Sequence, residues 1–156
     1  MAGADFLTVK PMHPLPDPDR QPDFYDGVPL RRFIAWVVDN LVILALCLIL
    51  VVITAFVGLV IWFLLVAVVG FIYRVATLAG GSATWGMRFA GIELRAADGS
   101  RFDGNLALWH TAGYTISFMF PFLQVISVVL MLTSPRGQGL TDMVLGSVAL
   151  RRRSGF

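Results

Sequence analysis

The chain has 156 residues, of which 57% are hydrophobic and only 14% are charged, and its mean hydropathy is +0.77. Soluble domains carry about 25% charged residues, so these figures exclude a soluble enzyme with its own hydrated surface, and they exclude disorder over most of the chain. The formal net charge is +2, and ten of the twelve basic residues lie between residues 30 and 156, where the apolar runs also lie. This pattern predicts a small integral membrane protein.

Residues 1–29 are predicted to be a disordered, acidic, proline-rich tail on the cytoplasmic side. They contain six of the eight prolines, five aspartates and two basic residues. Such a segment buries too little apolar surface to offset the entropy lost on ordering. It also lacks the apolar stretch of a signal peptide, so the first apolar run is expected to remain in the mature protein.

Residues 33–73 form the longest apolar run, and Asp39 is its one charged residue. A single helix of that length would measure about 62 Å, twice the hydrocarbon thickness of a bilayer. We therefore expect a transmembrane hairpin with helices near residues 33–54 and 58–78. Arginines flank the run at both ends and none lies in the turn, so both flanks are expected to be cytoplasmic.

The segment between residues 79 and 105 is polar and mixed. Ile92 and Leu94 alternate with polar residues ahead of Asp98-Gly99, a pattern typical of a strand followed by a tight turn. We expect a short β-hairpin-like cytoplasmic loop here.

Residues 106–133 carry no formal charge and contain Pro121 near their middle. As one helix of about 42 Å they could cross the bilayer once, but that crossing would place the arginines of the C-terminal segment outside, against the positive-inside tendency. A bent or re-entrant segment that turns at Pro121 keeps those arginines inside. Both alternatives stay open, and the re-entrant one agrees better with the charges. The Arg-rich tail, residues 151–156, then serves as a topology signal or lipid anchor.

Asp39 is the residue that most requires an explanation. An ionised carboxylate at mid-span costs about 2.5–3.5 kcal/mol, and less near the interface. Arg32, Ala35 and Asp39 are spaced i, i+3, i+7 and therefore share one helix face. In one interpretation Asp39 is a structural residue paired with a nearby arginine (Arg31, Arg32 or Arg74). In another it is an ion- or proton-coupled carboxylate inside a helical bundle, and in a third it is simply exposed to water.

Three stretches carry a further pattern: residues 30–39 (LRRFIAWVVD), 82–92 (SATWGMRFAGI) and 138–148 (QGLTDMVLGSV). In their order and spacing they resemble the RDD family of small bacterial membrane proteins. The resemblance covers residues 30–150 and maps the family's arginine and two aspartates onto Arg32, Asp39 and Asp142. His110 stands where many members have arginine, and Thr141 replaces the usual histidine.

The resemblance implies a multi-pass protein of the bacterial inner membrane whose activity is not settled. We expect an all-α membrane domain over residues 30–150, in which the hairpin is followed by a third bent or re-entrant helical segment at residues 106–133. The candidate charge cluster, functional or structural, consists of Arg32, Asp39 and Asp142, with His110 as an accessory residue.

Two functions are open at this stage. The first is a membrane scaffold or accessory module that binds protein or lipid partners. The alternative is an ion or small-solute transporter, exchanging a monovalent cation for protons through Asp39 in a homo-oligomer. An enzyme is not expected, because no metal-ligand cluster and no nucleophile or phosphate-loop motif is present. No cofactor and no nucleic-acid partner is expected either, since the basic residues form no patch with interleaved aromatics.

Overall fold

The computed structural model describes residues 15–54 and 57–152. Its elements are, in chain order, the 3₁₀ turn η1 (Pro22–Phe24), α1 (Val28–Ile53), α2 (Val57–Val60), α3 (Trp62–Gly81), α4 (Trp85–Ala90), β1 (Ile92–Arg95), α5 (Gly104–Met119), α6 (Pro121–Thr133), α7 (Leu140–Leu145) and β2 (Val148–Arg151). The predominantly helical membrane fold expected from the sequence is confirmed.

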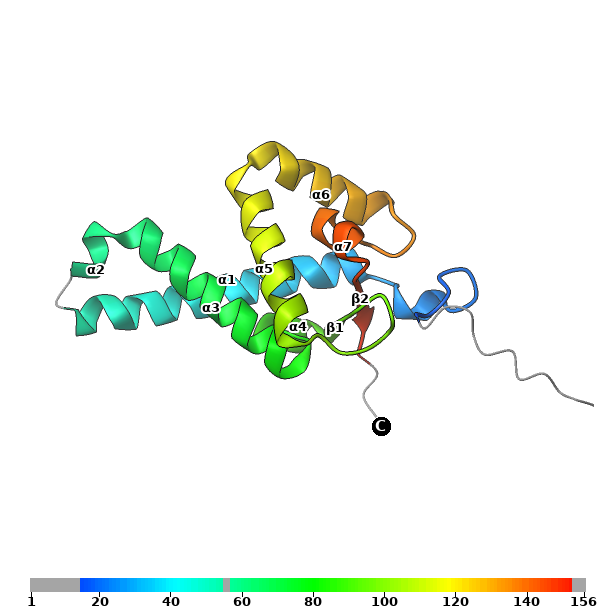
Figure 1. Ribbon diagram of the computed structural model, residues 1–156, viewed down its shortest axis with the longest axis horizontal. Helices are drawn as coiled ribbons and strands as arrows, with labels where there is room; N and C mark the ends of the chain where they lie inside the picture. Colours follow the sequence, from blue (N-terminus) through cyan, green and yellow to red (C-terminus); the bar gives the residue numbers. More distant parts are fainter. Residues whose placement is uncertain (1–14, 55–56, 153–156) are drawn as a thin grey trace, which may run out of the picture.

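Helices α1 and α3 form a long hairpin that extends away from the rest of the molecule (Figure 1). Both are long and apolar enough to cross a membrane. Helix α1 begins at Val28, earlier than the expected residue 33. Gly27 adopts φ +65° just before it, and Pro29 occupies the first turn. A proline is tolerated there because backbone N–H groups of the first turn have no acceptor within the helix. Helix α3 ends at Gly81, where Ser82 adopts a left-handed conformation.

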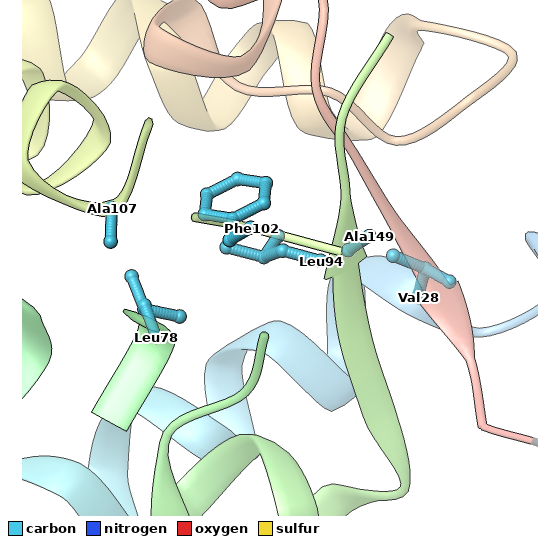
Figure 2. Close-up of a cluster of buried hydrophobic side chains, with 6 residues drawn as sticks. All are labelled: Val28, Leu78, Leu94, Phe102, Ala107 and Ala149. Atoms are coloured by element: carbon cyan, nitrogen blue, oxygen red, sulfur yellow. The ribbon is translucent and has the colours of Figure 1, made fainter. Parts of the chain in front are cut away.

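The open end of the hairpin is closed by a compact cap built from segments distant in sequence. Its apolar core, shown in Figure 2, contains Val28, Leu78, Leu94, Phe102, Ala107 and Ala149. Strands β1 and β2 pair antiparallel, with Ile92 opposite Arg151 and Arg95 opposite Val148. The strand predicted near Ile92 is therefore present and Gly99 does form a turn at φ +78°, but the partner strand comes from the C-terminal segment instead of from a local hairpin.

The tail contributes to this cap. Leu15 and Tyr25 are buried against Val148 and Leu150, and the Tyr25 hydroxyl donates a hydrogen bond to the carbonyl of Pro16 at 2.7 Å. The expectation of disorder over residues 1–29 is therefore wrong for the described part, residues 15–29, while residues 1–14 lie outside the described residues. Burial of these two apolar side chains, in a segment whose prolines already restrict the unfolded chain, offsets the ordering entropy.

The segment predicted at residues 106–133 is bent, as expected. The chain bends by 117° between α5 and α6, and the break lies at Phe120, whose extended backbone (φ −112°, ψ 99°) is typical of a residue that precedes proline. Because α5 follows β1 and the chain after α6 returns to pair with β1 through β2, the bent pair leaves and returns at the same end of the hairpin (Figure 1). A bent pair of this kind is either a broken span or a re-entrant loop.

Candidate functional site

One face of α1 carries the polar residues singled out by the sequence. Its buried positions follow helical spacing and are Val28, Ala35, Asp39, Ile43, Cys47 and Val51. Arg32 lies about two turns before Asp39 on the same side, and its side chain is 12% exposed. Helices α3 and α4 pack on this face beside Asp39, whereas α7 reaches the part that contains Arg32.

Asp39 accepts hydrogen bonds from three groups, and together they form what we call the Asp39 centre. Oδ1 accepts from the Tyr73 hydroxyl at 2.7 Å and from the backbone N–H of Gly86 at 2.8 Å. Oδ2 accepts from the Thr84 hydroxyl at 2.5 Å, and Nη1 of Arg74 lies 3.9 Å away. Asp39 is 1% exposed, so its charge is balanced within the protein. The centre fastens α4 to both helices of the hairpin.

The local sequence explains how α4 reaches Asp39. Thr84 is the N-cap of α4, and its hydroxyl oxygen accepts from the N–H of Met87 at 3.2 Å while the hydroxyl donates to Asp39. A Cβ atom at Gly86 would lie 2.1 Å from the carbonyl oxygen of Ala35. The Thr-x-Gly spacing thus provides a helix cap, a donor for the carboxylate and a site of close backbone approach.

Asp142 forms a second centre, the Asp142 centre, at the start of α7. Nη2 of Arg32 lies 2.5 Å from Oδ2, and Nε2 of His110 lies 2.9 Å from Oδ1. The Ser147 hydroxyl and the backbone N–H of Gly139 also donate to this carboxylate, each at 3.0 Å. The Asp142 centre therefore ties α7 and the approach to β2 onto α1 and α5.

The surroundings of Asp142 hold it in the ionised form. Burial alone would raise its pKa, but the Arg32 guanidinium, the hydrogen bond from His110 and the N–H of Gly139 lower it. The net result is a pKa well below the usual range for an aspartate. Hydrogen bonds and an opposite charge both favour the ionised carboxylate, and here they outweigh desolvation.

This shift predicts how the contribution of Asp142 to stability depends on pH. The Asp142→Asn variant is expected to be less stable than the wild type by about 1.5–3 kcal/mol at pH 7, as for hydrogen bonds to a charged group. A depressed folded-state pKa gives stability that is present above the unfolded pKa of about 3.9 and is lost as pH falls through the folded pKa. Unfolding of both proteins in the same detergent should show a constant difference from pH 7 to 5 that narrows below pH 4. If the stability difference between the wild type and Asp142→Asn already narrows between pH 7 and 6, the lowered pKa of Asp142 is contradicted.

The predicted cluster is thus divided between two centres. Arg32 is paired with Asp142 and not with Asp39, and His110 joins Asp142. Of the arginines considered for Asp39, Arg74 is the one nearby, whereas Arg31 donates to the carbonyl of Ala90 at 2.6 Å. Sequence reasoning missed three donors, Tyr73, Thr84 and Ser147. The stretches that resemble the family contain Thr84 (residues 82–92) and Ser147 (residues 138–148), whereas nothing in the local pattern distinguishes Tyr73.

A cavity of about 620 Å³ lies between α1 and the bent pair α5–α6. Both centres border it, since Arg32, Asp39, Arg74 and His110 belong to its lining. Within residues 15–54 and 57–152, no three His, Cys, Asp or Glu side chains come together in a way that could hold a metal ion.

The comparisons with known proteins gave one match. The model of the RDD family matches residues 27–146, a stretch that contains the cavity, the Asp39 centre and all of the Asp142 centre except Ser147. The comparisons with curated proteins and with solved structures found no match.

Proposed function

This chain belongs to the RDD family, and we propose that it is a scaffold or accessory module of the bacterial inner membrane that binds other membrane components and does not transport ions. Its two apolar helices, each long enough to cross a membrane, and its bent third segment support a membrane protein that passes the bilayer more than once.

The main support for this proposal is that both buried carboxylates, Asp39 and Asp142, accept hydrogen bonds from protein groups on neighbouring elements. A transporting carboxylate must exchange a proton or cation during each cycle. Asp39 is held by Tyr73, Thr84 and Gly86, so a cation that entered would have to displace the donors that join α4 to the hairpin. These donors hold the carboxylate in one place. Such an arrangement suits a structural role, in which Asp39 holds α4 against the hairpin.

The distribution of arginine supports an orientation with the cap and the N-terminus in the cytoplasm. Residues 33–73 contain no arginine or lysine, whereas arginines lie on both sides of that run and in the cap. Basic residues next to transmembrane helices favour the cytoplasmic side. The exposed apolar faces of α1 and α3 then contact the bilayer, a second copy of the chain or another membrane protein.

One feature favours the transport alternative, because Asp39 and Arg74 both border the cavity. A flux measurement separates the two functions. The purified full-length protein is reconstituted in sealed vesicles that contain a pH-sensitive dye, and sodium or potassium gradients are then applied. We expect no cation-dependent proton movement above that of protein-free vesicles.

An added sodium–proton ionophore provides the positive control, and it shows that the vesicles hold a gradient. Cation-dependent proton movement by the wild type that is lost in a folded Asp39→Asn variant would contradict the proposed function and establish transport.

A further inference from the structure

Helix α4 lies beside the hairpin at a depth that belongs to the bilayer. Helix α3 has 20 residues and therefore measures about 30 Å, the hydrocarbon thickness of a membrane, so that Gly81 marks its boundary on the cap side. The ring of Trp85, the first residue of α4, packs edge-on against the ring of Tyr73, with 6.1 Å between their centroids. Tyr73 lies about 12 Å before Gly81 along α3. Trp85 therefore lies next to a membrane-spanning helix, on the bilayer side of that boundary.

The residues of α4 divide into an inner face and an outer face. Gly86 and Ala90 are buried on the inner face, where Ala90 packs with Ala35 of α1. Trp85 and Phe89 are neighbours on the outer face, since they are spaced i, i+4, and they are 56% and 76% exposed. Two large aromatic side chains exposed together at this depth mark a surface that contacts lipid or another protein.

The third residue of the outer face, Arg88, favours lipid. Arg88 is exposed, and its guanidinium lies over Gly81, so close that a Cβ atom at Gly81 would clash with Nη2. The side chain thus extends from α4 back to the end of α3, the level of the headgroups. Long basic side chains near a bilayer extend in this way because their charge then stays in water or among headgroups. Aromatic rings beside such an arginine are typical of an interfacial helix.

We propose that α4 is an interfacial anchor, which inserts Trp85 and Phe89 into the bilayer leaflet on the cap side and holds Arg88 at the level of its headgroups. The opposite side of the same segment supplies two of the three hydrogen-bond donors of the Asp39 centre. Lipid on the outer face therefore contacts the element that covers Asp39. The inference goes beyond the proposed function, because it requires only that the chain spans a membrane and holds equally for a scaffold and a transporter.

Nitroxide spin labels on the full-length protein in phosphatidylcholine vesicles test the proposed depth. Cys47→Ala removes the only cysteine, and single labels are then attached through Trp85→Cys or Phe89→Cys. The hydrocarbon control is Leu48→Cys, at a position in α1 that is 51% exposed. The water control is Arg101→Cys, in the exposed loop before α5. The collision rate of each label with oxygen, which concentrates in lipid, is compared with that of a water-soluble nickel complex.

We expect both α4 labels to collide several-fold more often with oxygen than with the nickel complex, and to lie at a shallower depth than the label that replaces Leu48. The label that replaces Arg101 should show the opposite preference. If the α4 labels prefer the nickel complex as strongly as the Arg101 label does, α4 lies in water and the proposal is overturned. Low collision rates with both reagents, together with dipolar broadening between labels at Phe89, would overturn it by assigning the outer face to a second copy of the chain.

Tryptophan fluorescence provides a second measurement that needs no cysteine variant. Trp85→Phe keeps an aromatic ring at this position, so the difference between the emission of the wild type and of this variant reports on Trp85. Brominated phospholipids should quench this difference several-fold more than acrylamide dissolved in the water does. Quenching by acrylamide without quenching by the brominated lipids would contradict the insertion of α4. Ion flux by the wild type would contradict the proposed function but would leave both measurements unaffected.

Discussion

Replacing Gly86 by alanine is expected to lower the free energy of unfolding by about 3–5 kcal/mol, as for breaking a buried charge interaction. The new Cβ atom would lie 2.1 Å from the backbone oxygen of Ala35 and 2.8 Å from Oδ1 of Asp39. A backbone oxygen cannot turn away as a flexible side chain can, so α4 must move off α1. That movement breaks the hydrogen bond from Gly86 N–H to Asp39 and leaves the carboxylate with fewer donors.

The matched control is Gly80→Ala in α3. A Cβ atom at Gly80 has nothing within 4 Å, and alanine is favoured over glycine in a helix by about 0.5–1 kcal/mol. This control should therefore be as stable as the wild type or slightly more stable. Unfolding of the three proteins in the same detergent micelles provides the measurement. Equal stability of Gly86→Ala and Gly80→Ala would show that α4 does not need its close contact with α1.

The second large effect is expected at the Asp142 centre. Arg32→Gln should lower the free energy of unfolding by about 3–5 kcal/mol, because it leaves Asp142 buried without its arginine. Asp142 is 1% exposed, so water does not replace the lost partner. The control is Arg101→Gln, which changes an exposed arginine in the loop before α5 and should alter stability by no more than about 0.5 kcal/mol.

The double variant Arg32→Gln/Asp142→Asn makes the test specific to the ion pair. Because the uncompensated charge is then removed, the double variant should be more stable than Arg32→Gln alone. If the losses in the free energy of unfolding of the two single variants instead add up in the double variant, Arg32 and Asp142 do not interact. The Asp142 centre then does not hold α7 against α1.

The hairpin and the bend could be predicted from the sequence because their signals are local. A charge-poor run twice as long as a bilayer is thick requires a turn, and the proline at position 121 interrupts a helix wherever it occurs within one. The start of α1 was misplaced because the apolar run begins after the arginines, whereas Gly27 and Pro29 set the N-terminus of the helix. The tail was misjudged because Leu15 and Tyr25, which are buried, give no periodic pattern.

The partners of the polar residues could be predicted only in part. The spacing placed Arg32 and Asp39 on one helix face, but residues seven apart are separated by about 10 Å along the axis, so each one pairs with a different element. The pairing of β1 with β2 joins Leu94 to Ala149 across most of the second half of the chain. Such a contact leaves no local signal, and it determines where Asp142 lies.

Hydrogen exchange of the wild type and of Arg32→Gln, measured by mass spectrometry in the same detergent, tests most directly whether the polar centres hold the cap on the hairpin. The structure predicts faster exchange in Arg32→Gln over residues 139–151 and in β1, with unchanged protection in the middle of α1 and α3. Equal exchange of the two proteins over residues 139–151 would contradict a structural role for the Asp142 centre.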